Sequence, residues 1–195
     1  MSLFHKVRGK LFQYKTVLNS LYAKAYFRLN GVRYGTGLTV KGKIFVDNGG
    51  TVVIGDHCRF NSAMWANPTT HADQTAFRVF NGGILKIGNH CGISNVNITC
   101  TKEITIEDHV MIGAGCCIWD TDFHPINYES RISGENGPSK AITIKEGTFI
   151  GANVIIMKGV RIGKHSVIGA GSVVTKDVPD YEVVAGNPVK PIRKV

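Results

Sequence analysis

The sequence lacks the features of disulfide-bonded, zinc-binding and membrane-spanning proteins. It has five cysteines, an odd count, and no C-x-x-C pair occurs among them. We therefore expect neither a disulfide framework nor a zinc site, and a reducing cytoplasm is the simplest location. No hydrophobic run is long enough to span a bilayer, and lysine or arginine interrupts each apolar run of the first 31 residues. This pattern predicts no transmembrane helix and no cleaved signal peptide.

Proline is scarce, at six residues, and no low-complexity tract occurs, which argues against disorder. The 195 residues are enough for one domain with a sizeable core. The net charge of +9 suits nucleic acid, an anionic membrane surface or a phosphorylated ligand. No helix-turn-helix, zinc-finger or RNA-binding signature is present, so we expect no nucleic-acid partner.

An aliphatic residue returns at every sixth position in the second half of the chain. One run contains Ile106, Ile112 and Ile118, and a second contains Ile144, Ile150, Ile156, Ile162, Ile168 and Val174. A period of six fits neither an α-helix nor a long strand. It fits short straight runs separated by turns, which glycine permits, with three runs closing one coil. The pattern predicts a parallel β-helix of the hexapeptide type.

The first half of the chain repeats more loosely. NGGTVVIGDHCRF (48–60) and NGGILKIGNHCGI (81–93) are near copies 33 residues apart, and residues 67–77 between them read as an excursion from the coils. Residues 1–30 predict a helix with an apolar stripe. The stripe contains Phe4, Val7, Leu11, Tyr14, Leu18, Leu21 and Ala25. We expect this helix to pack on the end of the β-helix or on a neighbouring subunit; the alternative is a basic amphipathic anchor on a membrane surface.

Of the seven histidines, one stands apart from the repeat. Four of the others follow an isoleucine by three residues and are interpreted as coil-corner residues; these are His57, His90, His109 and His165. His124 instead falls on the sixth-residue position after Ile118. Pro125 follows it, and the polar segment 125–141 predicts a loop that projects from the β-helix.

A histidine at the edge of a loop is suited to accept a proton from a hydroxyl or an amine. Asp120 and Asp122 are the candidates to hold its other ring nitrogen. The alternative is that His124 anchors the loop through hydrogen bonds and performs no chemistry.

The residues TDFHPI (121–126), the loop and residues 142–195 resemble the hexapeptide-repeat acyltransferases. The resemblance is to the branch of maltose, galactoside and xenobiotic acetyltransferases and polysaccharide O-acetyltransferases. It is specific over residues 87–195, weaker over 38–66 and absent over the helix. It implies an all-β fold, a left-handed parallel β-helix over residues 31–195 after the N-terminal helix. It also implies a homotrimer that binds acetyl-CoA as cosubstrate in a cleft between adjacent coils.

The same resemblance assigns roles to individual residues. His124 would be the general base, with Asp122 as the second catalytic residue. The expected acetyl-CoA contacts are Gly151, Ala152 and Ala170 at the pantetheine arm, Thr175 and Lys176 at the nucleotide end, and Arg193 at a phosphate. The acceptor side aligns poorly, and we name only Asn95 and Trp119 there. Relatives often carry tryptophan where this chain has Phe149, which reduces the area for stacking. We expect no metal.

These features favour an acetyl-CoA-dependent O-acetyltransferase that acts on a sugar or a surface-polysaccharide precursor. The alternative acceptors are serine, an amino-sugar nucleotide and an antibiotic. A non-catalytic β-helix assembly module is a further alternative. A carbonic anhydrase on the same scaffold would need an H-x-x-x-x-H pair, and the sequence has none. A cytoplasmic location with peripheral contact at the inner face of the membrane is compatible with the basic N-terminal helix.

Overall fold

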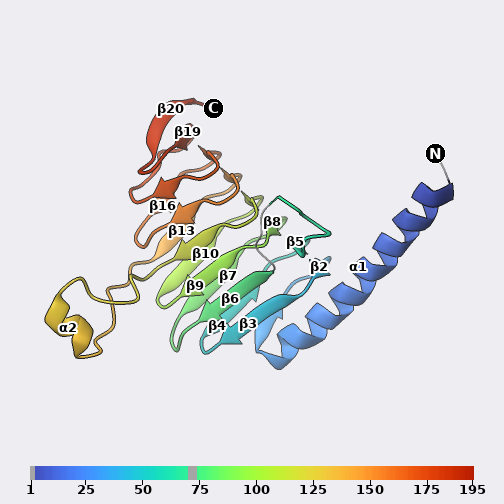
Figure 1. Ribbon diagram of the computed structural model, residues 1–195, viewed down its shortest axis with the longest axis horizontal. Coiled ribbons are helices and arrows are strands. Elements are labelled where there is room, and N and C mark those ends of the chain that lie inside the picture. The colour runs from blue at the N-terminus through green and yellow to red at the C-terminus, as the bar shows by residue number, and fades with distance from the viewer. Residues whose placement is uncertain (1–2, 70–73) are drawn as a thin grey trace.

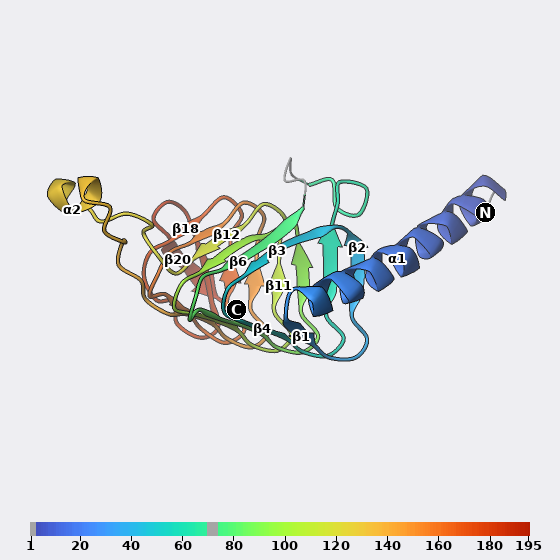
Figure 2. The ribbon, with the colours of Figure 1, turned by 90° about the horizontal axis from the view of Figure 1, so that it is seen from below.

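The computed structural model describes residues 3–69 and 74–195, with side chains from residue 7 onward. A long helix, α1 (Leu3–Leu29), precedes a column of short strands that rises to the C-terminus (Figure 1). A short helix, α2 (Tyr128–Ile132), lies on a loop that projects from the side of the column (Figure 2). Within these described ranges, neither helix is long and apolar enough to cross a membrane.

Three sheets form the walls of the column, and we name them A, B and C. Sheet A contains β1 (Val32–Tyr34), β4 (Thr51–Ile54), β7 (Ile84–Ile87), β10 (Glu103–Ile106), β13 (Ile142–Ile144) and β16 (Arg161–Ile162). Sheet B contains β2 (Thr39–Gly42), β5 (Arg59–Ser62), β8 (Gly92–Ser94), β11 (Met111–Ile112), β14 (Phe149–Ile150), β17 (Val167–Ile168), β19 (Glu182–Ala185) and β20 (Lys190–Lys194). Sheet C contains β3 (Ile44–Asn48), β6 (Thr75–Val79), β9 (Asn97–Cys100), β12 (Cys117–Trp119), β15 (Ile155–Ile156) and β18 (Val173–Val174).

The chain visits sheets A, B and C in turn, and each strand pairs in parallel with the strand of the next coil. Among the described strands, the one antiparallel pair in these sheets is β19 with β20, at the C-terminal end. The sixth-residue positions align in this register: Ile118 faces Ile156, and Ile156 faces Val174 in sheet C. All three side chains are fully buried. The predicted hexapeptide β-helix is therefore confirmed, because the repeat places one aliphatic side chain from each run inside the prism.

The four corner histidines also lie where the repeat predicts. His57, His90, His109 and His165 adopt left-handed backbone conformations with φ between 55° and 59°. They occupy the turns between sheets A and B, where a positive φ is needed to change direction. The rings of His90 and His109 stack with centroids 5.0 Å apart.

All five cysteines are free, and four of them are buried inside the prism. They fill core positions as small apolar side chains. Burial raises the pKa of the Cys100 thiol to about 12 and that of Cys116 to about 11. These two thiols therefore stay protonated at neutral pH.

The helix packs on the first coil, but with a different face from the predicted stripe. Phe27 and Ala23 are buried against the β-helix, whereas Leu11 and Leu18 of the predicted stripe are 65% and 49% exposed. The Ser20 hydroxyl accepts a hydrogen bond from Val40 N at 2.9 Å. The helix packs on the β-helix through residues outside the predicted stripe because α1 is apolar on two opposite faces. Contact of the stripe with a neighbouring subunit or a membrane surface stays a prediction.

The predicted excursion 67–77 extends too far at its end. Residues 75–77 belong to β6, where Phe77 is fully buried and pairs in register with Ile98. Residues 70–73, which include His71, lie outside the described residues. The period-six pattern missed this strand because the core positions after the insertion are not a multiple of six residues from those before it.

Candidate active site

His124 lies at the base of the projecting loop, outside the prism. The chain leaves β12 at Trp119, and the His124 side chain is exposed. It lines a cavity of about 570 Å³ together with Trp119, Asp122, Phe123, Arg131 and Lys158, among others. A larger cavity of about 790 Å³ lies beside α1, and the lining residues that the structure describes there include no His, Cys, Asp or Glu. The proton-transfer groups named from the sequence are therefore found at the loop.

The base of the loop is closed by its own backbone. Asp122 N donates to Pro138 O at 3.2 Å, and Gly137 N donates to Phe123 O at 3.2 Å. Phe123 has a φ of 62°, in the left-handed region that non-glycine residues seldom adopt. We call residues 121–124 and 137–139 the loop neck; it fixes the backbone on both sides of His124.

Asp120 is fully buried beneath the loop neck. Its carboxylate accepts hydrogen bonds from the backbone N–H groups of Thr101 and Lys102, both at 2.7 Å, and of Glu103 at 2.9 Å. With these partners it holds the end of β12 against the coil before it. Asp120 therefore positions the backbone, and its oxygens are occupied away from the His124 ring.

Asp122 pairs with a lysine that no motif in the sequence marks. Its Oδ2 lies 2.6 Å from the ammonium of Lys158, and the two side chains are 17% and 23% exposed. Lys158 follows β15, so this ion pair joins the loop neck to the next coil. Among the described residues, no side-chain hydrogen bond links His124 to Asp120 or Asp122. A lysine at a coil corner carries no signal in the sequence that distinguishes it from any surface lysine.

Trp119 is half-buried beside His124, at the end of β12. Its ring meets that of Phe123 edge to face, with centroids 5.7 Å apart and an interplanar angle of 73°. The aromatic pair forms one wall of the cavity. Of the two predicted acceptor-binding residues, the structure places Trp119 in the same cavity as His124.

The other predicted site residues divide between two edges of sheet C. Thr175 and Lys176 follow β18, on the same edge as Lys158 and the loop neck. Gly151, Ala152 and Ala170 lie on the opposite edge, where the chain passes from sheet B to sheet C. A Cβ added to Gly151 would lie 2.6 Å from Ala170 N, so these corners stack directly on each other. One copy of the chain therefore does not bring both groups to one cavity.

Asn95 and Arg193 lie apart from the His124 cavity. Asn95 occupies the corner between β8 and β9, with a φ of 43° and 1% exposure. Its Oδ1 is buried without a hydrogen-bond partner among the described residues. Arg193 lies on β20, paired in register with Val183, and is exposed at the C-terminal end of sheet B.

Two family profiles match the repeats. The bacterial transferase hexapeptide family (six repeats) matches residues 141–176, and the hexapeptide repeat of succinyl-transferase matches residues 103–121. The galactoside O-acetyltransferase of Lactococcus lactis is 44% identical over 104 residues, which cover 52% of this chain and 49% of that protein. These matches show that the repeats of the chain are similar to those of the hexapeptide-repeat acetyltransferases. It spans about half the length of the curated relatives it matches.

Solved structures of this family extend the likeness over most of the chain. A hexapeptide-repeat acetyltransferase from Vibrio cholerae, complexed with acetyl-CoA, is 28% identical with a TM-score of 0.52. The match covers 82% of this chain and 71% of that one. A galactoside acetyltransferase in complex with coenzyme A is 28% identical with a TM-score of 0.51, covering 82% and 65%. The left-handed β-helix of these hexapeptide-repeat acetyltransferases confirms the predicted fold class.

Proposed function

We propose that the protein is an acetyl-CoA-dependent O-acetyltransferase that acts on a sugar or a surface-polysaccharide precursor. The observation that carries this proposal is the exposed imidazole of His124, held by a fixed loop neck in a cavity beside Trp119. The resemblance to galactoside O-acetyltransferases supports a sugar hydroxyl as the acceptor group. The half-buried indole of Trp119 offers an apolar surface of the kind on which sugar rings pack.

In this proposal His124 is the general base. Acetyl-CoA supplies a thioester carbonyl, and the imidazole accepts the proton of the acceptor hydroxyl as its oxygen attacks. The C–O bond forms, the C–S bond breaks, and coenzyme A leaves as a thiol that takes the proton from the imidazolium. The loop neck limits the movement of the ring, which keeps the base at one distance from the acceptor. Asp122 acts through Lys158: their ion pair ties the neck to the next coil. Asp122 is therefore a positioning residue.

We further propose that the complete site lies between two copies of the chain, in a homotrimer. The loop neck and the glycine–alanine corners lie on opposite edges of sheet C, so a second copy must bring one to the other. Gly151, Ala152 and Ala170 have no long side chain, and backbone groups there are open to the thin pantetheine arm. Lys176 and Arg193 supply cations for the phosphates of the cosubstrate.

The direct test is thiol release by the purified protein with acetyl-CoA and a panel of acceptors. The panel contains galactosides, serine, an amino-sugar nucleotide and an aminoglycoside antibiotic. We expect release of coenzyme A with a sugar hydroxyl as acceptor, and an O-acetylated sugar by mass spectrometry. Turnover with one of the other acceptors alone would replace the sugar assignment. Absence of coenzyme A binding by calorimetry would instead favour the non-catalytic assembly module.

A further inference from the structure

The outward face of α1 is apolar and faces away from the β-helix. It carries seven large apolar side chains that are between 49% and 65% exposed: Val7, Leu11, Tyr14, Val17, Leu18, Leu21 and Tyr22. We call these residues the outer stripe. They fall within about 140° of the helix circumference at 100° per residue. A continuous exposed stripe of this kind marks a surface that binds a partner.

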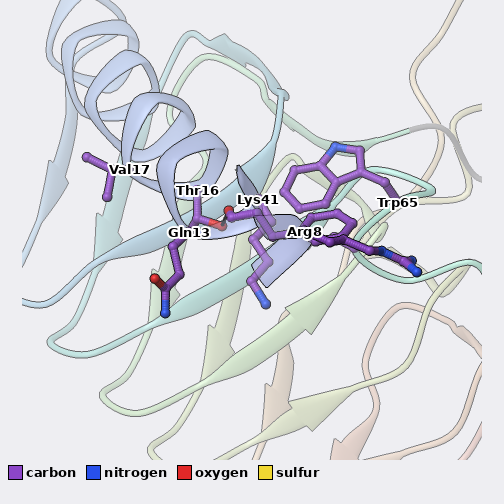
Figure 3. A pocket seen from close by; sticks show the side chains of 8 residues that line it. Arg8, Gln13, Thr16, Val17, Lys41 and Trp65 are labelled. Atoms are coloured by element: carbon purple, nitrogen blue, oxygen red, sulfur yellow. Dashed lines mark hydrogen bonds between the residues drawn. The ribbon is translucent and has the colours of Figure 1, made fainter. Parts of the chain in front are cut away.

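The rotation of the helix about its axis is fixed by contacts on the opposite face. Near the C-terminal end, Phe27 is fully buried and the Ser20 hydroxyl is bonded to Val40. Near the N-terminal end, the Phe12 ring stacks on Trp65 with centroids 5.6 Å apart, and the Lys15 ammonium lies 4.5 Å from the Trp65 centroid. Figure 3 shows Trp65 beside this part of α1. These contacts hold the outer stripe away from the protein.

Positive charge flanks the outer stripe on both sides. At 100° per residue, Arg8 and Lys15 fall on one flank and Lys24 falls on the other. Lys10 and Arg28 fall just inside that second edge of the stripe, beside Val17. This arrangement lets long basic side chains reach past an apolar surface into a polar layer.

The net charge of the chain is concentrated around this helix. Residues 1–46 contain nine Lys and Arg and no Asp or Glu, whereas residues 47–195 contain 14 of each sign. The whole net charge of +9 is therefore carried by α1 and the first strands. The partner of this surface must be anionic, because no acidic side chain in this region compensates the charge.

We propose that α1 docks the protein on an anionic phospholipid surface. The helix lies in the plane of the interface, with the outer stripe at the boundary between headgroups and acyl chains. The flanking Lys and Arg meet the lipid phosphates. The helix runs beyond the first coil, so its outer stripe is accessible along its length (Figures 1 and 2). This inference goes beyond the proposed transferase function, and it holds for any acceptor.

A second copy of the chain fits this surface less well than a bilayer does. Packing two outer stripes together would bring two acid-free segments into contact, and like charges on the flanks would repel. The remainder of the chain has no net charge with which to compensate them. The charge distribution therefore selects the lipid surface over self-association.

The test is co-sedimentation of the full chain with vesicles of phosphatidylcholine alone or with 30–40% phosphatidylglycerol. We expect binding to the anionic vesicles only, with binding that weakens as salt screens the charges. Leu11→Ser with Leu18→Ser and Leu21→Ser should lower the partition coefficient at least tenfold, because those side chains leave the apolar boundary. Lys10→Gln with Lys24→Gln should lower it about 25-fold, or fivefold per charge.

Matched controls separate the helix from general surface chemistry. Ile126→Ser with Ile132→Ser removes two exposed apolar side chains of the projecting loop, and Lys102→Gln with Lys190→Gln removes two charges from the β-helix. Both controls should bind anionic vesicles within twofold of the wild type. Equal loss in the controls and the helix variants would overturn the proposal, because binding would then be non-specific.

A second measurement tests lipid docking even if the serine variants of the helix fail to fold. Leu18→Trp places a reporter on the outer stripe, and its fluorescence should be quenched by lipids with bromine on the upper acyl chain. Wild-type protein that stays in the supernatant with anionic vesicles would refute lipid docking. If the triple serine variant then loses oligomeric order in sedimentation velocity, the outer stripe is an interface between copies of the chain. Acetyl transfer to a soluble acceptor should be unchanged in the triple serine variant if the outer stripe binds lipid. It should be lost with the oligomer if the stripe is an interface between copies, because the proposed site lies between two copies.

Discussion

The position of Gly137 offers a sharp test of whether the loop neck positions the catalytic base. Its backbone lies directly against that of His124, and a Cβ added to Gly137 would lie 2.7 Å from His124 N and 2.9 Å from its C and O atoms. An ordinary contact begins at 3.4 Å, so Gly137→Ala must move the two segments apart by about 0.7 Å. Gly137 does not have a positive φ, so the effect is steric alone.

A displacement of this size is large on the scale of catalysis. Misplacement of a reacting group by about 1 Å can cost about 100-fold in rate, so we expect kcat of Gly137→Ala to fall between about 10-fold and 100-fold. The melting temperature should change little, because the neck lies outside the aliphatic core. The assay is thiol release at saturating acetyl-CoA, with thermal unfolding followed by circular dichroism.

Gly9→Ala is the matched control. Among the described residues, no heavy atom lies within 4 Å of a Cβ added there, and Gly9 lies on α1 far from the His124 cavity. It should keep the kcat of the wild type. If Gly137→Ala is also active within twofold of the wild type, the neck does not position His124 and the reasoning from steric contact is refuted.

Three further predictions test other parts of the structure. Lys158→Met should lower the stability by about 1–3 kcal/mol in urea unfolding, because it leaves the Asp122 carboxylate without its partner; an unchanged midpoint would count against the ion pair. Ile156→Ala should cost about 2–5 kcal/mol by the same measurement, since this fully buried side chain leaves a cavity in the core. The backbone N–H of Asn89 is the main cause of the lowered pKa of Asp108, ordinarily 3.8. A carboxyl whose pKa is lowered by folding stabilises the protein at pH values above its pKa in the unfolded chain. This stabilisation is lost as the pH falls through the pKa of the folded state. The melting temperature of the wild type should therefore exceed that of Asp108→Asn near neutral pH, and the gap should close below about pH 4; a constant gap would contradict this sign.

The period of six predicted the core of the β-helix because every sixth-residue position points into the prism. Ile112, Ile150 and Ile168 face one another in sheet B as the repeat requires. The repeat also distinguishes the corner histidines, which share one position in the coil, from His124. A repeat assigns each sequence position a place in the coil and an expected residue type. A residue of another type at such a position, such as His124 where an aliphatic residue is expected, can therefore be recognised from the sequence.

The helix face could not be predicted in the same way. Phe12, Ala23 and Phe27 form one apolar series on α1, and Leu11 and Leu18 belong to another on the opposite side. A search for apolar residues at three- and four-residue steps selects the longer of the two series, which is the outer stripe. Which face packs on the first coil depends on the shape of that coil, and periodicity does not contain that information.

The partners of the candidate site residues depend on contacts between coils. The sequence places Asp120 and Asp122 near His124 but does not show that Asp120 is buried under backbone N–H donors. The pairing of Asp122 with Lys158 joins residues 36 positions apart across a loop of unknown path. Such contacts depend on which residues of stacked coils lie side by side. The loop interrupts the six-residue spacing, so the sequence does not give this register across it.

The role of His124 as the general base is the centre of this account, and the most direct test is the turnover of His124→Ala. We predict that kcat for acetyl transfer falls by about 100-fold to 10,000-fold, while the affinity for coenzyme A in calorimetry stays within twofold of the wild type. Turnover equal to that of the wild type would contradict the account and leave His124 as an anchor of the loop.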